Sequence, residues 1–358
     1  MTALRRLGVL TSGGDCAGLN AAIRAVTVHA HRAGLEVIGL LDGTLGLMDR
    51  PLRYLALHPD RLDERLLREG GTVLGTTNRG DPFRFPMADG SYRDRSGEFA
   101  AGARELGLDA LVVIGGDGSM RIVSRLCEAA GIGMVGIPKT IDNDVHGTEY
   151  AIGFATAINV VVDALDRLQP TAASHHRVMI LETMGRDAGH IALNGGIAGG
   201  ADVILIPELR YTLDGVAARL RAVLAQGRRH ALVVVAEGAR TESGALVTAG
   251  AGGNYGGIGH HLAEAITRKT GAETRVTILG HVQRGGTPSP RDRLVASAFG
   301  VRAVQLALER KFGCMVAWQD RGVTEVPLSQ VTVGARAVAA DDPMIAAARG
   351  LGIYVGEG

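Results

Sequence analysis

The sequence is poor in aromatic residues, in cysteine and in net charge. Aromatic residues make up 4% of its 358 positions, and 38 Lys and Arg side chains nearly balance 37 Asp and Glu side chains. A net charge of +1 gives no support for a nucleic-acid groove or a membrane-surface protein. No apolar run reaches the ~18 residues of a membrane-spanning helix. We therefore expect no nucleic-acid partner and no membrane.

The three cysteines exclude two further classes of protein. Cys16, Cys127 and Cys314 lie far apart and are odd in number, so they provide neither a CxxC metal pair nor a disulfide framework. The first ten residues contain two arginines but no long apolar stretch after them, which is unlike a signal peptide. We expect buried, reduced thiols in a cytoplasmic protein.

Aliphatic residues and glycine are abundant instead. Hydrophobic residues reach 46%, which excludes wholesale disorder, and the 52 glycines follow no strict period, which excludes collagen. Short, continuous apolar runs alternate with helical patterns, as in parallel sheets that are buried on both faces. The patterns predict strands over 7–11, 36–41, 110–114, 134–137, 178–181, 203–206, 232–236 and 276–279, and helices over 19–32, 119–130, 154–168, 213–226, 258–270 and 291–309. The fold class is therefore α/β, with two Rossmann-like three-layer lobes, mostly parallel sheets, and an active site in the cleft between them.

Two glycine-rich turns each follow a predicted strand and open a predicted helix. The first is LTSGGDCAGLN at 10–20, and the second is IGGDGS at 114–119. Backbone N–H groups in such turns, together with the helix dipole, bind anions. Asp117 could hold Mg²⁺ or could simply cap its helix, and the first turn could be an ordinary strand–helix connection. Neither turn is a Walker A loop or a GxGxxG fingerprint.

The segment IPKTIDND at 137–144 places three polar acceptors after another strand. A carboxylate there could accept the proton of an attacking hydroxyl, and Lys139 could neutralise phosphate charge. The alternatives are a solvated turn or a calcium loop, but the glycine and terminal glutamate of an EF-hand are missing.

Two later segments carry side chains that suit a sugar phosphate. LETMGRD at 181–187 offers the Arg186 guanidinium after a tight turn, and GHVQRGG at 280–286 offers His281 and Arg284. His281 on its own would equally suit a structural role. Glu237 ends a predicted strand, where ligands bind in α/β sheets. Arg177 precedes a predicted strand and could reach a neighbouring subunit.

These five segments, in this order, resemble the 6-phosphofructokinases of the bacterial type. The resemblance runs from about residue 7 to about residue 293. It implies transfer of a phosphoryl group from ATP, with Mg²⁺, to the 1-hydroxyl of fructose 6-phosphate in glycolysis. It also implies a larger nucleotide-binding lobe, 1–152 plus 282–331, and a smaller sugar-phosphate-binding lobe, 153–281 plus 332–358.

The resemblance assigns roles to individual residues. Asp142 is the general base, with Arg186 and Lys139 beside the reaction, and Asp117 is the magnesium ligand. The donor nucleotide would be held by Gly14, Arg79, Gly80, Gly116, Asp117, Gly118 and Ser119, although Asn78 competes with Arg79 for its place in the alignment. The substrate would be held by Thr140, Ile141, Asp142, Arg177, Met184, Gly185, Arg186, Glu237, Arg275, His281, Val282, Gln283 and Arg284.

The family's counterparts of Arg177 and Arg275 reach the 6-phosphate in a neighbouring subunit. A monomer would therefore hold an incomplete site, and the resemblance implies a homodimer or homotetramer.

Two positions bear on the phosphoryl donor and point in opposite directions. Gly118 leaves room for the α-phosphate of ATP, where the pyrophosphate-dependent enzymes have an acidic residue. Lys139 resembles the pyrophosphate users, since typical bacterial ATP enzymes have glycine there. Steric blockage is close to absolute, whereas a lysine only adds attraction for any phosphate. We therefore favour ATP and keep a reversible pyrophosphate-dependent enzyme as the alternative.

Two rival classes remain. The NAD and lipid kinases also place GGDG after a strand, but they give no reason for LETMGRD or GHVQRGG. A regulator that binds nucleotide or sugar phosphate without catalysis is the non-enzyme alternative, against which the intact Asp117, Asp142 and Arg186 argue.

The resemblance also makes a prediction about regulation. Well-known bacterial members bind ADP or phosphoenolpyruvate in a basic pocket at a subunit interface. Arg24 and Arg228 match that pocket, whereas Val28, Gln169 and Gln226 replace basic groups. We expect an altered or absent response, because fewer cations hold a phosphate more weakly. Fructose 6-phosphate saturation curves with and without phosphoenolpyruvate test this, and a strong shift in cooperativity would contradict it.

Overall fold

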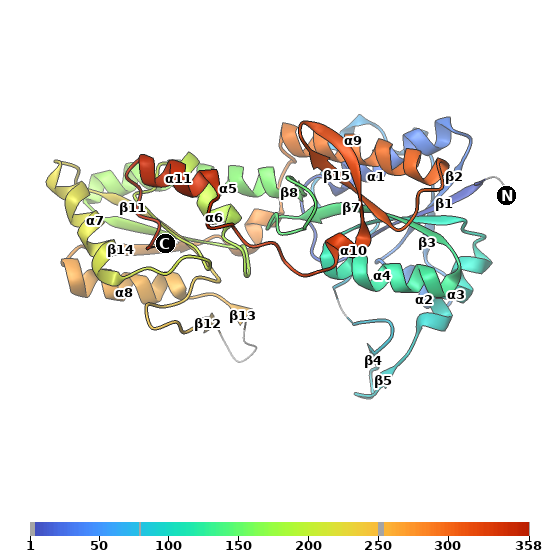
Figure 1. The fold of residues 1–358 in the computed structure, drawn as a ribbon, viewed down its shortest axis with the longest axis horizontal. Helices are drawn as coiled ribbons and strands as arrows, with labels where there is room; N and C mark the ends of the chain where they lie inside the picture. The colour runs from blue at the N-terminus through green and yellow to red at the C-terminus, as the bar shows by residue number, and fades with distance from the viewer. Residues whose placement is uncertain (1–3, 79, 250–253, 358) are drawn as a thin grey trace. The chain divides into compact units, whose positions relative to one another are not determined.

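The computed structural model describes residues 4–78, 80–249 and 254–357 (Figure 1). The chain divides into two compact units, and each is assembled from segments that are far apart in sequence. Unit 1 comprises Met1–Thr140, Val145–Ala155 and Arg284–Gly334. Unit 2 comprises Ile141–Asp144, Thr156–Gln283 and Ala335–Gly358.

Unit 1 is built on a mostly parallel sheet with the strand order β16-β15-β7-β6-β1-β2-β3, and β8 pairs with β7. The outermost strands, β3 and β16, run antiparallel to their neighbours, whereas β15, β7, β6, β1 and β2 are parallel. The strands are β1 Arg6–Thr11, β2 Glu36–Leu40, β3 Tyr54–Leu57, β6 Ala110–Gly115, β7 Gly133–Thr140, β8 Ile152–Gly153, β15 Cys314–Gln319 and β16 Gly322–Pro327.

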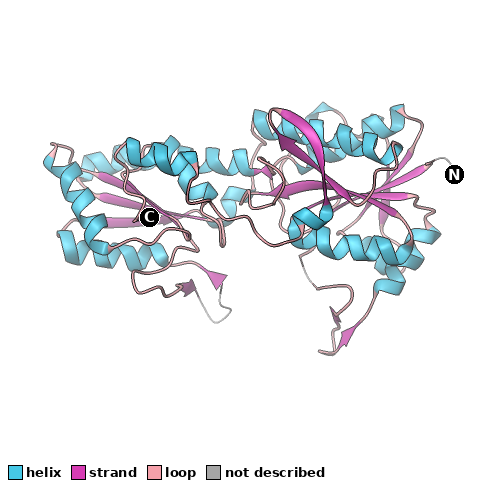
Figure 2. Cartoon of the chain, in the orientation of Figure 1, coloured by secondary structure: helices cyan, strands magenta, loops and turns pink. Residues whose placement is uncertain are grey.

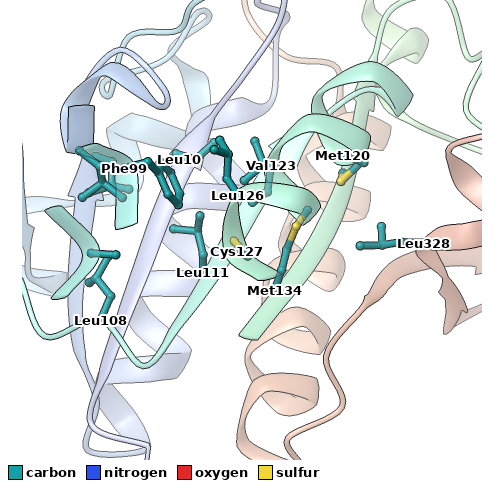
Figure 3. Close-up of a cluster of buried hydrophobic side chains, with 14 of the residues drawn as sticks. Leu10, Phe99, Leu108, Leu111, Met120, Val123, Leu126, Cys127, Met134 and Leu328 are labelled. Atoms are coloured by element: carbon teal, nitrogen blue, oxygen red, sulfur yellow. The ribbon is translucent and has the colours of Figure 1, made fainter. Parts of the chain in front are cut away.

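Helices cover both faces of this sheet, which makes three layers. In Figure 1, α1 (Leu19–Arg32) and α9 (Pro290–Leu308) lie over one face. The other face carries α2 Leu45–Met48, α3 Ser96–Glu105, α4 Asp117–Ala130 and α10 Leu328–Val331. Figure 3 shows the core beneath α3 and α4, where Phe99 and Leu126 meet Leu10 and Leu111 of the sheet. Their burial holds α4 in place at the end of β6.

Unit 2 has a smaller sheet with the strand order β10-β11-β9-β14, in which all neighbours are parallel. Its strands are β9 Val178–Thr183, β10 Val203–Leu205, β11 Ala231–Ala236 and β14 Thr274–Ile278. Its helices are α5 Phe154–His175, which begins in unit 1, α6 His190–Ala198, α7 Leu213–Ala225, α8 Ile258–Thr270 and α11 Pro343–Gly350. The apolar faces of α7 and α8 pack on the sheet through residues such as Leu220, Leu262 and Ile266.

Short elements complete the chain. Two short antiparallel strand pairs join β4 (Phe85–Pro86) to β5 (Tyr92–Arg93), and β12 (Thr248–Ala249) to β13 (Asn254–Tyr255). The 3₁₀ turns are η1 Pro59–Arg61, η2 Glu64–Arg68 and η3 Gly280–Arg284. A helix of the length and apolarity needed to cross a bilayer does not occur in the described part of the chain.

The predicted fold class, two α/β lobes with mostly parallel sheets, is confirmed, and Figure 2 shows a helix-covered sheet in each unit. All eight predicted strands and all six predicted helices are present, with ends that differ by a few residues for most of them. The continuous apolar runs predict these strands because a strand that is buried on both faces does not alternate apolar with polar residues.

Other elements were not predicted from the sequence, and two of them lack the usual local signal. The hairpin of β15 and β16 turns at Asp320 and Arg321, whose φ angles are 47° and 66°, rather than at an Asn-Gly pair. Helix α6 contains Gly195 and Gly196, which disfavour a helix. A Cβ atom at Gly195 would lie 2.6 Å from Val161 Cγ1, so close packing requires the glycine.

A glycine in α9 gives a prediction about stability. A Cβ atom at Gly300 would lie 2.6 Å from Ala25 Cβ and 2.9 Å from Ala22 O, both in α1. Gly300→Ala should therefore destabilise the protein by about 1–3 kcal/mol, although alanine is the better helix former by about 1 kcal/mol. Urea denaturation measures the difference. The matched control is Gly97→Ala in α3, where a Cβ atom would meet nothing within 4 Å, and equal stability of the two variants would contradict the packing argument.

Candidate active site

The carboxyl ends of β1, β6 and β7 bring the two glycine-rich turns, and the third polar segment as far as Thr140, to one edge of the unit 1 sheet. Thr11 pairs with Ile114, and Gly115 pairs with Pro138. The Ser12 N–H donates to Ile114 O at 3.0 Å, which fixes the first turn beside the second. Parallel strands end at the same edge, so turns that are more than 100 residues apart become neighbours.

The turn Gly13–Asp15 is held by its carbonyl oxygens. Thr76 Oγ1 donates to Gly13 O at 2.7 Å, Lys139 Nζ to Gly14 O at 2.5 Å, and Arg284 Nη1 to Asp15 O at 3.1 Å. Within the described part of the chain, the N–H groups of Gly14 and Asp15 donate to no protein oxygen. A turn whose carbonyls are occupied and whose N–H groups are available suits an anion.

The second turn leads directly into α4. Gly116 is the N-cap of this helix, and Asp117, Gly118 and Ser119 form its first turn. Ser119 reaches the first turn, because a Cβ atom at Gly13 would lie 3.4 Å from Ser119 Oγ. A Cβ atom at Gly118 would meet nothing within 4 Å, so the space beside this residue is open.

Asp117 is the predicted magnesium ligand at this edge. Among the described residues there is no group of three or more His, Cys, Asp or Glu side chains that could hold a metal ion. Mg²⁺ needs no such group, since it commonly takes one or two carboxylates and completes its shell with water and phosphate oxygens. The Asp117 carboxylate at the start of α4, beside two phosphate-type turns, therefore fits a magnesium ion that arrives with a polyphosphate.

Two buried side chains, those of Lys139 and Cys16, lie next to the first turn. Lys139, the penultimate residue of β7, is only 4% exposed. Burial raises the pKa of the Cys16 thiol to about 12, and its Sγ donates to Ile152 O at 3.2 Å. The thiol therefore stays protonated and is not a nucleophile.

The segment that follows β7 belongs to unit 2. Thr140 ends β7 in unit 1, and Ile141, Asp142 and Asn143 are buried in unit 2. Asp142 is 5% exposed, and Asn143 has a φ angle of 53°, in the left-handed region that residues other than glycine seldom adopt.

The carboxyl edge of the unit 2 sheet gathers most of the predicted sugar-phosphate residues. Gln283 Oε1 accepts the Met184 N–H at 2.7 Å, and Glu237 Oε1 accepts the Arg186 N–H at 3.1 Å. Gly185, with a φ angle of 146°, makes the bend between them. Gln283 is only 1% exposed, so it supports the turn from beneath.

His281 and Val282 lie next to Gln283 in η3, and both are exposed, Val282 to 61%. The last residue of η3, Arg284, belongs to unit 1 and contacts the first turn.

Arg177 and Arg275 lie at the opposite, amino-terminal edge of the unit 2 sheet. Glu273 Oε1 joins them, at 2.9 Å from Arg177 Nη2 and in close contact with Arg275 Nη2. The hydrogen bond from Arg177, followed by the charges of both guanidinium groups, lowers the pKa of Glu273. The six residues of β9 separate this pair from Met184, so unit 2 does not bring these arginines to the other sugar-phosphate residues.

The predicted nucleotide contacts near residue 80 are only partly described. Arg79 lies outside the described residues. Gly80 has a φ angle of 74°, and the competing Asn78 is exposed. Thr77 O accepts the Gly13 N–H at 2.9 Å, which places this segment beside the first turn.

Four residues that organise these sites were not found from the sequence. Thr76 holds Gly13, Glu273 joins the two arginines, Glu182 accepts the Gly257 and Gly259 N–H groups, and Arg336 binds the segment around Asp142. Glu182 had a detectable signal, because a carboxylate inside a buried strand needs partners. Thr76 and Arg336 had none, since both lie in irregular segments.

The two arginines of the predicted effector pocket are already paired within their own units. Arg24 Nε donates to Leu62 O at 3.0 Å in unit 1. Arg228 makes a two-pronged ion pair with the buried Asp202, at 2.7 and 2.9 Å, in unit 2.

Among solved structures, the chain is similar to phosphofructokinase from Saccharomyces cerevisiae. The two share 31% sequence identity with a TM-score of 0.78 over 91% of this chain. The match covers 45% of the yeast chain, so this protein spans less than half of that relative's length.

Curated relatives match over their whole length. Two proteins named ATP-dependent 6-phosphofructokinase 1, from Nostoc sp. and Synechocystis sp., are each 56% identical to this chain, and the matches cover 100% and 99% of both partners, respectively. The family model described as Phosphofructokinase matches residues 6–307. These matches and the two-lobed α/β fold lead to one conclusion: the chain belongs to the phosphofructokinase family.

Proposed function

We propose that this protein is an ATP-dependent 6-phosphofructokinase, which transfers the terminal phosphoryl group of ATP to the 1-hydroxyl of fructose 6-phosphate. The observation that carries the proposal is the meeting of Gly13–Asp15 and Gly116–Ser119 at one sheet edge, with N–H groups available and a carboxylate beside them. The full-length similarity to relatives named for this activity supports it. Glycolysis in the cytoplasm is the corresponding setting, in line with three buried, free cysteines.

On the donor side, the N–H groups of the first turn and the start of α4 bind the phosphates. Gly14, Gly116, Gly118 and Ser119 line this space, and Arg79 and Gly80 would contact the nucleotide. Mg²⁺ at Asp117 would neutralise charge on the phosphates. Preorganised donors of this kind stabilise the charge that develops during phosphoryl transfer.

Two observations favour ATP over pyrophosphate. The open space beside Gly118 leaves room for the rest of a nucleotide beyond its terminal phosphates. The Lys139 ammonium is hydrogen-bonded to Gly14 O, so the turn itself accounts for this lysine without a pyrophosphate substrate. Gly118 and Lys139, which favour different donors in the sequence analysis, are therefore both compatible with ATP.

On the acceptor side, Asp142 takes the proton of the 1-hydroxyl. Thr140 and Ile141 precede the base, and Lys139 and Arg186 place positive charge for the reacting phosphoryl group. The carboxyl edge of the unit 2 sheet, with Met184, Gly185, Arg186 and Glu237, would bind the sugar phosphate together with His281, Val282, Gln283 and Arg284. Fixing the far phosphate orients the hydroxyl, which turns binding energy into rate.

Arg177 and Arg275 would serve the site of a neighbouring subunit. Their place at the amino-terminal edge of the unit 2 sheet, away from Met184, supports this assignment. The active form would then be a homodimer or a homotetramer.

The role of the base can be tested by Asp142→Asn. Removal of a general base costs typically about 10²–10⁴-fold in turnover, and we expect a loss of kcat in this range with little change in affinity for fructose 6-phosphate. Steady-state kinetics with MgATP measure both quantities. The matched control is Asp163→Asn on the exposed surface of α5, which should keep normal turnover. Near-normal kcat in Asp142→Asn would show that another group is the base.

The donor can be tested with the unmodified enzyme, fructose 6-phosphate and magnesium. We expect turnover with ATP, and turnover with pyrophosphate alone would overturn the proposed donor. Gly118→Asp should weaken ATP use by about tenfold or more, because a like charge a few ångström from a phosphate costs about 1–4 kcal/mol. Gly97→Asp, at another open helical glycine, is the control. Unchanged ATP kinetics in Gly118→Asp would show that the space is not occupied by nucleotide.

A further inference from the structure

The segment around Asp142 depends on contacts from a distant part of the chain. Ile141–Asp144 packs in unit 2, although the residues on both sides of it, Thr140 and Val145, belong to unit 1. The chain therefore passes from unit 1 to unit 2 and back within a few residues. Backbone carbonyl oxygens of this segment are bound by a residue from another part of unit 2.

Arg336, nearly 200 residues later in the chain, provides such contacts. Its backbone N–H donates to Asp144 O at 2.6 Å, and its Nη2 donates to Asn143 O at 2.8 Å. A single residue therefore holds two successive carbonyl oxygens directly after Asp142. Asn143 adopts a left-handed φ angle of 53°, which asparagine tolerates better than most residues, and the two hydrogen bonds lie at this bend.

Arg336 is itself held from the other side. His190 Nε2, at the start of α6, lies 3.1 Å from Arg336 O. Burial, followed by the charge of Arg336, lowers the pKa of His190, so a neutral ring donates this hydrogen bond at neutral pH. Glu208 Oε1 accepts the Val338 N–H at 2.8 Å and the Gly189 N–H at 2.9 Å. The segment 335–338 is thereby joined to the start of α6.

We propose that Arg336 is a positioning residue for catalysis, which holds the Asn143 and Asp144 carbonyls so that the Asp142 carboxylate faces the hydroxyl of the sugar. The inference rests on the proposed function. Arg336 touches neither substrate nor donor in this role. It acts through the backbone next to the base, and α6 and Glu208 act through Arg336.

The expected consequence is a selective loss of turnover. A displacement of the base by about 1 Å can cost about 10²-fold in rate, whereas the groups that bind the phosphates are left in place. Loss of the guanidinium should therefore lower kcat and leave the KM for fructose 6-phosphate and the affinity for MgATP nearly unchanged.

The test uses the full-length enzyme with Arg336→Met, which removes the guanidinium and keeps the backbone N–H. We expect a fall in kcat of about 10- to 100-fold with KM values within about twofold of the unmodified enzyme. Arg336→Lys should recover part of the lost rate, because the ammonium can reach one carbonyl. Arg349→Met, at an exposed position of the nearby α11, is the matched control and should keep full activity.

A double variant separates positioning from a purely structural role. If Arg336 works through the base, Arg336→Met should cost little further rate in the Asp142→Asn background, because the two effects share one pathway. Fully additive losses, or an unchanged kcat in Arg336→Met, would overturn the inference. Thermal unfolding of each variant verifies that the folded fraction is equal.

Failure of the proposed function would look different from failure of this inference. An unmodified enzyme that phosphorylates fructose 6-phosphate with neither ATP nor pyrophosphate would remove the proposed function. If the unmodified enzyme is active and Arg336→Met has the same kcat, only the proposed role of Arg336 is overturned.

Discussion

The Gly13–Asp15 turn, which we propose binds phosphate, depends on hydrogen bonds to its backbone carbonyl oxygens. Gly13, Gly14 and Asp15 present their carbonyls to Thr76, Lys139 and Arg284, which come from three distant segments of unit 1. When the carbonyl side of a turn is occupied by donors, its N–H side is left to bind an anion. Two of these donors are cations, so they also place positive charge close to where phosphates would bind.

Backbone carbonyl oxygens are also bound by a distant residue directly after Asp142 in unit 2. Arg336 holds the carbonyls of Asn143 and Asp144, and it comes from the last 24 residues of the chain. In both places the side chain of an arginine or lysine donates hydrogen bonds to backbone carbonyl oxygens. Charge-assisted hydrogen bonds of this kind are shorter and stronger than neutral ones, which suits turns that must keep one conformation.

Glycine permits the close approaches around these turns. Gly13 has a positive φ angle, and a Cβ atom at Gly14 would lie 2.6 Å from Arg284 Nη1. Gly118 is different, because space and not conformation distinguishes it: nothing lies within 4 Å of the Cβ position. Gly13 and Gly14 therefore meet the needs of backbone geometry and close approach, whereas Gly118 leaves open space at the start of α4.

The sequence by itself determined the strands that are buried on both faces, the amphipathic helices between them, and the five segments that carry the family resemblance. These features are local, because the apolar runs and the glycine turns lie within short stretches of chain. Only the tertiary structure decided which distant donors hold those turns, that Gln283 lies beneath Met184, and that Arg177 and Arg275 share Glu273 at the far edge of their sheet. No local pattern encodes such pairings, because each joins residues whose proximity depends on strand order and register. The contacts of Thr76 and Arg336, which lie in irregular segments, could therefore not be predicted from the sequence.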